Sequence, residues 1–136
     1  MVRSDVLPTG KLPLELLQRL LSAYTSTDDR LVAGPRVGED VAVVDMGDRY
    51  MVIKTDPITF ATDEIGWYAV HVNANDIATS GATPRWMLAT ILLPEAATTP
   101  DMVEAIFRQL YGACHDLGVI LVGGHTEVTH GLSRPI

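Results

Sequence analysis

The sequence of 136 residues is long enough for one domain with a hydrophobic core and too short for two ordinary domains. Its net charge of −7 argues against general binding to nucleic acid, and no apolar run approaches the roughly 20 residues that a membrane-spanning helix needs. The first residues carry no secretory signal, and the single cysteine, Cys114, suits a reducing compartment. We therefore expect a cytoplasmic protein without a nucleic-acid or membrane partner.

The first half of the chain predicts one helix followed by two strands. Leucines recur at helical spacing between Lys11 and Tyr24. Two strand-like runs follow at residues 41–44 and 50–55, and the turn-forming residues 45–48 between them favour a hairpin.

The second half predicts a helix, a strand, a second helix and a second strand. Helical spacing returns over residues 63–80, and the dense apolar run at 86–93 has the length of a buried strand. Thr99 and Pro100 are typical of the cap and first position of the next helix, which Gly118 ends. A last short strand covers residues 119–122.

This order of elements indicates an α+β fold, with a small four-stranded mixed sheet and helices on one face. Because the strands are apolar on both sides, we expect a homodimer in which a second chain covers the open face. Residues 1–35 are expected to form an N-terminal helix and lead-in loop, and residues 36–136 the main domain. The segment 126–136 contains no completing element and looks like a chain cut at a domain boundary.

Three short polar side chains, Asn73, Asn75 and Asp76, interrupt the otherwise apolar helix predicted at 63–80. Asn and Asp are poor helix formers because their side chains compete for backbone hydrogen bonds. A solvated helix face is the simple alternative, but we favour a functional site because Asn75 and Asp76 directly precede apolar Ile77.

Two further aspartates flank the predicted hairpin, Asp40 before its first strand and Asp56 after its second. Carboxylates at strand ends can converge on one cleft, where Mg²⁺ binds one or two of them together with phosphate oxygens. Each aspartate has an ordinary alternative, as a turn residue or as a strand stop.

The glycine pair Gly123–Gly124 follows the last predicted strand. Glycines let backbone N–H groups approach a phosphate closely, and Thr126 and Glu127 add a hydroxyl and a carboxylate. By itself a Gly-Gly pair is more often an ordinary turn.

Together these pieces resemble the N-terminal domain of the aminoimidazole ribonucleotide synthetase superfamily. Thiamine monophosphate kinase, selenophosphate synthetase and the hydrogenase maturation carbamoyl dehydratase belong to this superfamily. The lead-in at residues 10–14 looks most like the hydrogenase maturation branch. His125 departs from the thiamine monophosphate kinases, which have an acidic residue there. The resemblance is carried by residues 38–44, 55–56, 72–78, 81–84, 92–94 and 118–126.

The resemblance implies ATP and Mg²⁺ as cofactors and a homodimer in which the sheets of two chains close into a barrel. It matches Asp40, Asp56 and Asp76 to acidic positions that hold Mg²⁺ against ATP, and it matches Thr55 and Thr126 to polar positions. No catalytic residue is assigned. The expected metal ligands are Asp40, Asp56, Asp76 and Glu127, and the expected nucleotide-binding residues are Thr55, Asn75, Gly123, Gly124, His125 and Thr126.

The predicted function is that of the nucleotide-binding half of an ATP-dependent enzyme. Such an enzyme phosphorylates an amide or carbamoyl oxygen of a small acceptor, so that loss of phosphate gives dehydration or ring closure. The family's C-terminal domain is absent from these residues, and the acceptor is therefore not identified. Two alternatives stay open: a thiamine monophosphate kinase-like phosphotransferase, and a non-catalytic nucleotide-binding or dimerisation module.

Overall fold

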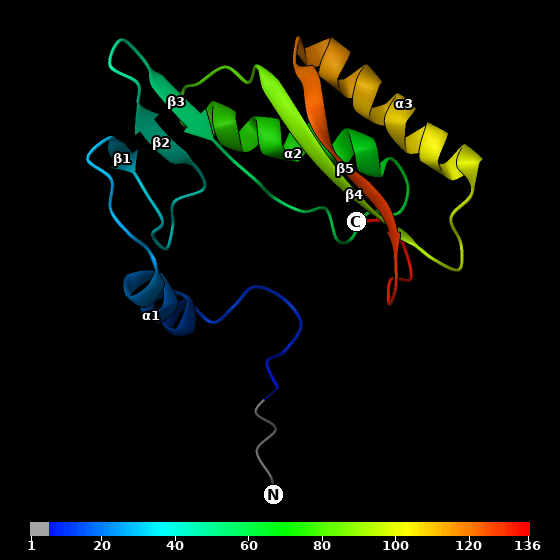
Figure 1. Ribbon diagram of the computed structural model, residues 1–136, viewed down its shortest axis with the longest axis horizontal. Coiled ribbons are helices and arrows are strands. Elements are labelled where there is room, and N and C mark those ends of the chain that lie inside the picture. The colour runs from blue at the N-terminus through cyan, green and yellow to red at the C-terminus, as the bar shows by residue number, and fades with distance from the viewer. Residues whose placement is uncertain (1–5) are drawn as a thin grey trace, which may run out of the picture. The chain divides into compact units, whose positions relative to one another are not determined.

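The computed structural model describes residues 6–136, which form two compact units, one up to Ile53 and one from Lys54 to Ile136 (Figure 1). The fold is α+β, as predicted. None of the described helices is both long and apolar enough to cross a membrane. The elements in chain order are α1 (Leu14–Tyr24), β1 (Leu31–Ala33), β2 (Ala42–Asp45), β3 (Tyr50–Ile53), α2 (Ile65–Thr79), β4 (Trp86–Pro94), α3 (Pro100–Leu117) and β5 (Ile120–Thr129).

The first unit contains α1 and an antiparallel sheet with the strand order β1-β2-β3. The predicted hairpin of β2 and β3 is confirmed, and Asp45 lies opposite Tyr50 at its closed end. There the backbone N–H of Gly47 donates to the Asp45 carboxylate at 2.7 Å, and Gly47 has the positive φ of 94° that favours glycine in a tight turn. Strand β1 was not predicted, because three residues are too few to show an alternating pattern.

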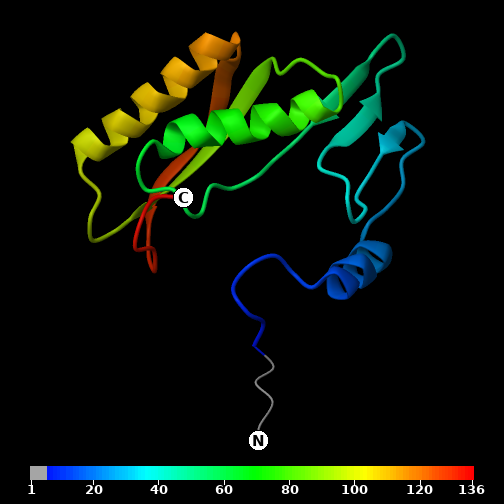
Figure 2. The same cartoon turned by 180° about the vertical axis from the view of Figure 1, so that it is seen from behind.

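The second unit is built on β4 and β5, which pair in parallel with α3 as the connection between them. Helices α2 and α3 cover one face of this strand pair, as the two opposite views show (Figures 1 and 2). The predicted four-stranded mixed sheet is therefore wrong: the described strands form a three-stranded and a two-stranded sheet. Local sequence patterns identified four of the five described strands, but they do not determine which strands pair.

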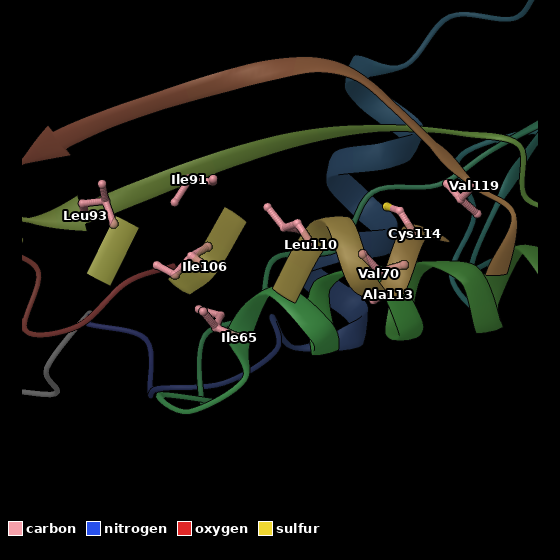
Figure 3. Packing of buried hydrophobic residues seen from close by; sticks show 9 residues of the cluster. All are labelled: Ile65, Val70, Ile91, Leu93, Ile106, Leu110, Ala113, Cys114 and Val119. Carbon is pink, nitrogen blue, oxygen red and sulfur yellow. The ribbon is translucent and has the colours of Figure 1, made fainter. Parts of the chain in front are cut away.

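The core of the second unit lies between the helices and the strand pair (Figure 3). Helix α3 contributes residues at helical spacing, and Cys114 among them is a buried thiol whose pKa is raised by burial. The alternating Ile91 and Leu93 supply the strand side. The buried residues are Ile65, Val70, Ile91, Leu93, Ile106, Leu110, Ala113, Cys114 and Val119.

Both predicted ends of α3 are confirmed. The hydroxyl of Thr99 accepts a hydrogen bond from the Met102 N–H at 3.2 Å, which caps the first turn. Gly118 ends the helix with a left-handed φ of 66°, and its N–H and that of Val119 bond to carbonyls of the last turn.

Strand β5 is longer than predicted. We expected it to end at residue 122, whereas it continues through both glycines to Thr129, so that the alternative of a Gly-Gly turn is wrong. The extension is polar and lacks the apolar alternation by which a strand is recognised. The chain end also pairs with this sheet, since the backbone groups of Ile136 and Leu92 exchange hydrogen bonds of 2.9 and 3.0 Å.

Glycine is needed at one contact between α2 and α3. A Cβ atom on Gly66 would lie 2.7 Å from the Ile106 carbonyl oxygen and 2.9 Å from the Gln109 Cβ. Gly112, in α3, has no atom within 4 Å of the corresponding position. The two positions therefore form a matched pair of helical glycines, of which only one is sterically required.

We predict that Gly66→Ala lowers the free energy of unfolding by about 1–3 kcal/mol, because the helices must separate to admit the methyl group. Gly112→Ala should leave it unchanged or raise it by up to about 1 kcal/mol through better helix propensity. Urea unfolding of both variants is the measurement. Equal stability of the two variants would contradict the close contact.

Candidate functional site

Asn73 ties the segment after β3 to helix α2. Its side-chain oxygen accepts a hydrogen bond from the Asp56 N–H at 2.8 Å, and its amide group donates to the Asp56 carbonyl at 3.1 Å. The same amide group donates to the Ala69 carbonyl one turn earlier in α2, at 2.9 Å. Asn73, which we singled out as a polar residue in an apolar helix, therefore fixes the backbone of a predicted site residue.

Lys54 lies between two of the predicted metal ligands. Its ammonium group is 2.7 Å from a carboxylate oxygen of Asp76 and 3.4 Å from one of Asp56. The Lys54 side chain is only 9% exposed, compared with 25% for Asp76 and 48% for Asp56. The structure thus brings Asp56 and Asp76 together, as predicted, but it does so around a lysine.

The electrostatics of this cluster favour the charged lysine. Burial by itself would lower the pKa of Lys54, but the hydrogen bond from Lys54 to Asp76 and the charges of Asp56 and Asp76 outweigh it, so that the pKa is raised. Lys54 therefore stays an ammonium ion at neutral pH. One positive and two negative charges leave the cluster with a net charge near −1.

Lys54 was missed in the sequence because it is a single lysine at the end of an apolar run, with no cluster of basic residues around it. Its functional importance could have been suspected from its position directly before Thr55 and Asp56, both of which were predicted site residues. Thr55 and Asn75 are both exposed, and within residues 6–136 their side chains form no hydrogen bond. Their proposed contacts with nucleotide stay predictions.

The glycine pair allows β5 to lie against β4. A Cβ atom on Gly124 would fall 1.8 Å from the Ala89 carbonyl oxygen, so that no other residue fits without moving a strand. A register shift between Met87 and Leu88 accompanies this close approach. Gly124 therefore has a structural role, and the expected contact of Gly123 and Gly124 with a phosphate stays a prediction.

The polar residues after the glycines are exposed along β5. His125 and Glu127 lie on the same side of the strand, and the His125 ring nitrogen Nε2 is 3.0 Å from a Glu127 carboxylate oxygen. Thr126 points to the opposite side. In the described part of the chain, no hydrogen bond or ion pair joins these residues to the cluster at Lys54.

The residues as they stand do not fit a divalent ion. Among residues 6–136, no group of three or more His, Cys, Asp or Glu side chains is arranged to hold a metal. Asp56 and Asp76 converge, but the Lys54 ammonium takes the place between them that a cation would need. Asp40 belongs to the first unit, where it is exposed. The metal-binding roles of Asp40, Asp56, Asp76 and Glu127 stay predictions.

A cavity of about 510 Å³ lies elsewhere in the second unit, where the start of α2 and helix α3 approach residues 133–135. None of the predicted site residues lines it. The candidate site is therefore the cluster of Lys54, Asp56, Asn73 and Asp76, with the polar segment of β5 as a separate candidate surface.

Comparison with known proteins places this site in a family context. Residues 38–136 match the model of the family described as AIR synthase related protein, N-terminal domain. The chain is 30% identical to the selenide, water dikinase of Pseudomonas straminea over 92% of its length and 33% of that protein. It is 33% identical to the carbamoyl dehydratase HypE of Cupriavidus necator over 88% of its length and 34% of that protein. Thiamine-monophosphate kinases are also among the similar proteins.

A solved structure, hydrogenase maturation protein HypE in complex with ATP, is similar with a TM-score of 0.51 and 25% identity. The match covers 85% of this chain and 32% of the HypE chain. The chain thus spans about a third of the length of the relatives that it matches. All residues of the Lys54 cluster and of the β5 segment lie inside the family match.

We predict that Asn73→Ala lowers the free energy of unfolding by about 1–2 kcal/mol and speeds hydrogen exchange at the Asp56 amide, because that N–H loses its acceptor. Asn75→Ala is the matched control, since Asn75 is exposed in the same helix and alanine is the better helix former. Urea unfolding and amide exchange of both variants are the measurements. If the Asp56 amide exchanged as fast in Asn75→Ala as in Asn73→Ala, the role of Asn73 in holding the Asp56 backbone would be refuted.

Proposed function

Since the chain belongs to the AIR synthase related family through its N-terminal domain, we propose that it forms the nucleotide-binding part of an ATP-dependent enzyme. The observation that carries the proposal is the charged cluster of Lys54, Asp56 and Asp76, held on a segment that Asn73 ties to α2. The cluster lies inside the residues that match the family. The similarity to a HypE structure that contains ATP supports the choice of nucleotide.

The proposed reaction is transfer of the γ-phosphoryl group of ATP to an amide or carbamoyl oxygen. ADP leaves in this step, and the phosphorylated oxygen departs later as phosphate, which gives dehydration or ring closure. This chain's residues would bind and orient the nucleotide, which is most of what phosphoryl transfer requires of a protein. Because the chain spans about a third of its relatives, we propose that the remainder of such an enzyme positions the acceptor.

Mg²⁺ enters this proposal from the family resemblance. Its proposed ligands are Asp40, Asp56, Asp76 and Glu127, of which Asp56 and Asp76 would be available only after the Lys54 ammonium group had moved from between them. Bound Mg²⁺ would screen the phosphate charges. Because Lys54 already neutralises part of the Asp56 and Asp76 charge, no step of the reaction is assigned to the ion. Thr55, Asn75 and residues 123–126 are the proposed nucleotide contacts.

A second candidate is phosphorylation of a phosphate group, as the name thiamine-monophosphate kinase describes for another set of relatives. One such kinase, from Archaeoglobus fulgidus, is 31% identical over 84% of this chain. His125 stands where the resemblance leads us to expect an acidic residue in such kinases, and we therefore rank this candidate second. A nucleotide-binding module without catalysis is the third reading.

We predict that the protein binds ATP in the presence of Mg²⁺, and that Asp76→Asn weakens this binding about tenfold or more. The substitution removes a charged partner of Lys54 and so disorders the cluster. Calorimetry with ATP and Mg²⁺, repeated with EDTA, is the measurement. Asp116→Asn is the control, because Asp116 is an exposed residue of α3 that belongs to neither candidate surface. Equal affinity of wild type and Asp76→Asn would remove Asp76 from the site.

We also propose a homodimer, because one face of the β4–β5 pair is apolar and uncovered. Met87 and Leu121 pack toward the core, whereas Trp86 and Leu88 on the other face are 71% and 72% exposed. Ile120 and Val122 of β5 are also exposed. An exposed apolar patch on a strand pair favours association, and closure with the sheet of a second copy would bury it.

We predict a dimer mass in light scattering at tens of micromolar protein. Leu88→Lys should shift the mass toward the monomer, because it puts a charge into the proposed interface. Tyr111→Lys is the control, since Tyr111 is 71% exposed but lies on α3. A monomeric wild type would contradict the proposed dimer.

A further inference from the structure

We infer that the Lys54 ammonium group occupies the position between Asp56 and Asp76 that a bound cation would take, and that it opposes binding of a divalent ion to these two carboxylates. The ammonium group lies 2.7 Å from Asp76 and 3.4 Å from Asp56, which are the partners that a bound metal would need. This competition involves only side chains of the protein itself and does not depend on ATP binding.

The arrangement differs from an ordinary surface ion pair in how firmly it is held. The Lys54 side chain is nine-tenths buried, so that the solvent screens its interactions less than those of an exposed lysine. The backbone of Asp56 is fixed by two hydrogen bonds to Asn73, and Asp76 is one turn further along the same helix. The backbone positions that carry the two carboxylates are therefore held in place.

The competition follows from the charges. Without Lys54, two neighbouring carboxylates would carry two negative charges, and oxygen ligands of this kind are those that Mg²⁺ and Mn²⁺ bind. With Lys54 in place, the cluster has a net charge near −1, and its shortest contact is already made by the ammonium. A divalent ion must break that contact and leave a nearly buried ammonium next to a second positive charge.

The test is a titration with Mn²⁺, without nucleotide, followed by calorimetry and by the electron paramagnetic resonance of the free ion. Lys54→Met removes the charge and keeps most of the side-chain volume, so we expect it to bind Mn²⁺ at least about tenfold more tightly than wild type. Lys54→Arg keeps the charge and should bind as weakly as wild type. The double variant Lys54→Met, Asp76→Asn should lose the gain, because one carboxylate is missing.

Arg108→Met is the matched control. It removes the same charge from the same unit, but from an exposed pair with Glu104 on α3. We expect this variant to bind Mn²⁺ as wild type does, which separates the local effect of Lys54 from that of the more negative net charge.

Equal Mn²⁺ affinity of wild type and Lys54→Met would overturn the inference, and so would a gain that survives in the double variant. If Lys54→Met folds poorly, thermal unfolding with and without Mn²⁺ replaces the titration, with Lys54→Gln as a second variant. We expect Mn²⁺ to raise the midpoint temperature of thermal unfolding of both variants and to leave that of the wild type unchanged. An unchanged midpoint in both variants would equally overturn the inference. Because nucleotide is absent throughout, a failure of ATP binding does not affect these outcomes.

Discussion

The second unit depends on the burial of one face of a two-stranded parallel sheet by two helices. Two strands by themselves are marginally stable, so that β4 and β5 rely on the apolar sides of α2 and α3. Two glycines permit this packing: Gly66 lets α2 approach α3, and Gly124 lets β5 approach β4. Once α2 is fixed in this way, Asn73 and Asp76 are fixed with it, and Asn73 in turn holds Asp56. The geometry of the charged cluster is thus a consequence of the core.

Much of this fold could be predicted from the sequence, because the helices have strong local signals. Apolar residues at helical spacing, the Thr99 cap and the Gly118 stop act within a few residues of one another. Strand pairing could not be predicted in the same way, because partners are far apart in the chain. The polar half of β5 was missed for a related reason: its place in the sheet comes from hydrogen bonds to β4, not from apolar side chains.

The candidate site was predicted only in part: two of its aspartates were named, whereas Lys54 and the contacts between the residues were not. The sequence analysis placed polar residues of α2 in a candidate site, and in the structure Asp56 and Asp76 lie on either side of Lys54. Asn73, however, holds backbone groups, a role that only the fold reveals. Lys54 escaped notice because a single lysine directly after an apolar strand forms no local pattern. Its importance arises from two aspartates that lie 2 and 22 positions further along the chain.

Strand β5 connects the two surfaces proposed for function. Its first residues, Ile120 and Val122, belong to the apolar face proposed for the dimer, and its later residues, His125 to Glu127, form the exposed polar segment proposed for nucleotide. The glycine pair separates the two stretches, and the close approach at Gly124 fixes the later one against β4. A second copy that covers the apolar stretch would therefore also restrain the strand whose continuation meets the nucleotide. Dimer formation and nucleotide affinity would then be coupled through one strand. The substitution Leu88→Lys should therefore weaken both, although Leu88 is not itself a proposed nucleotide contact.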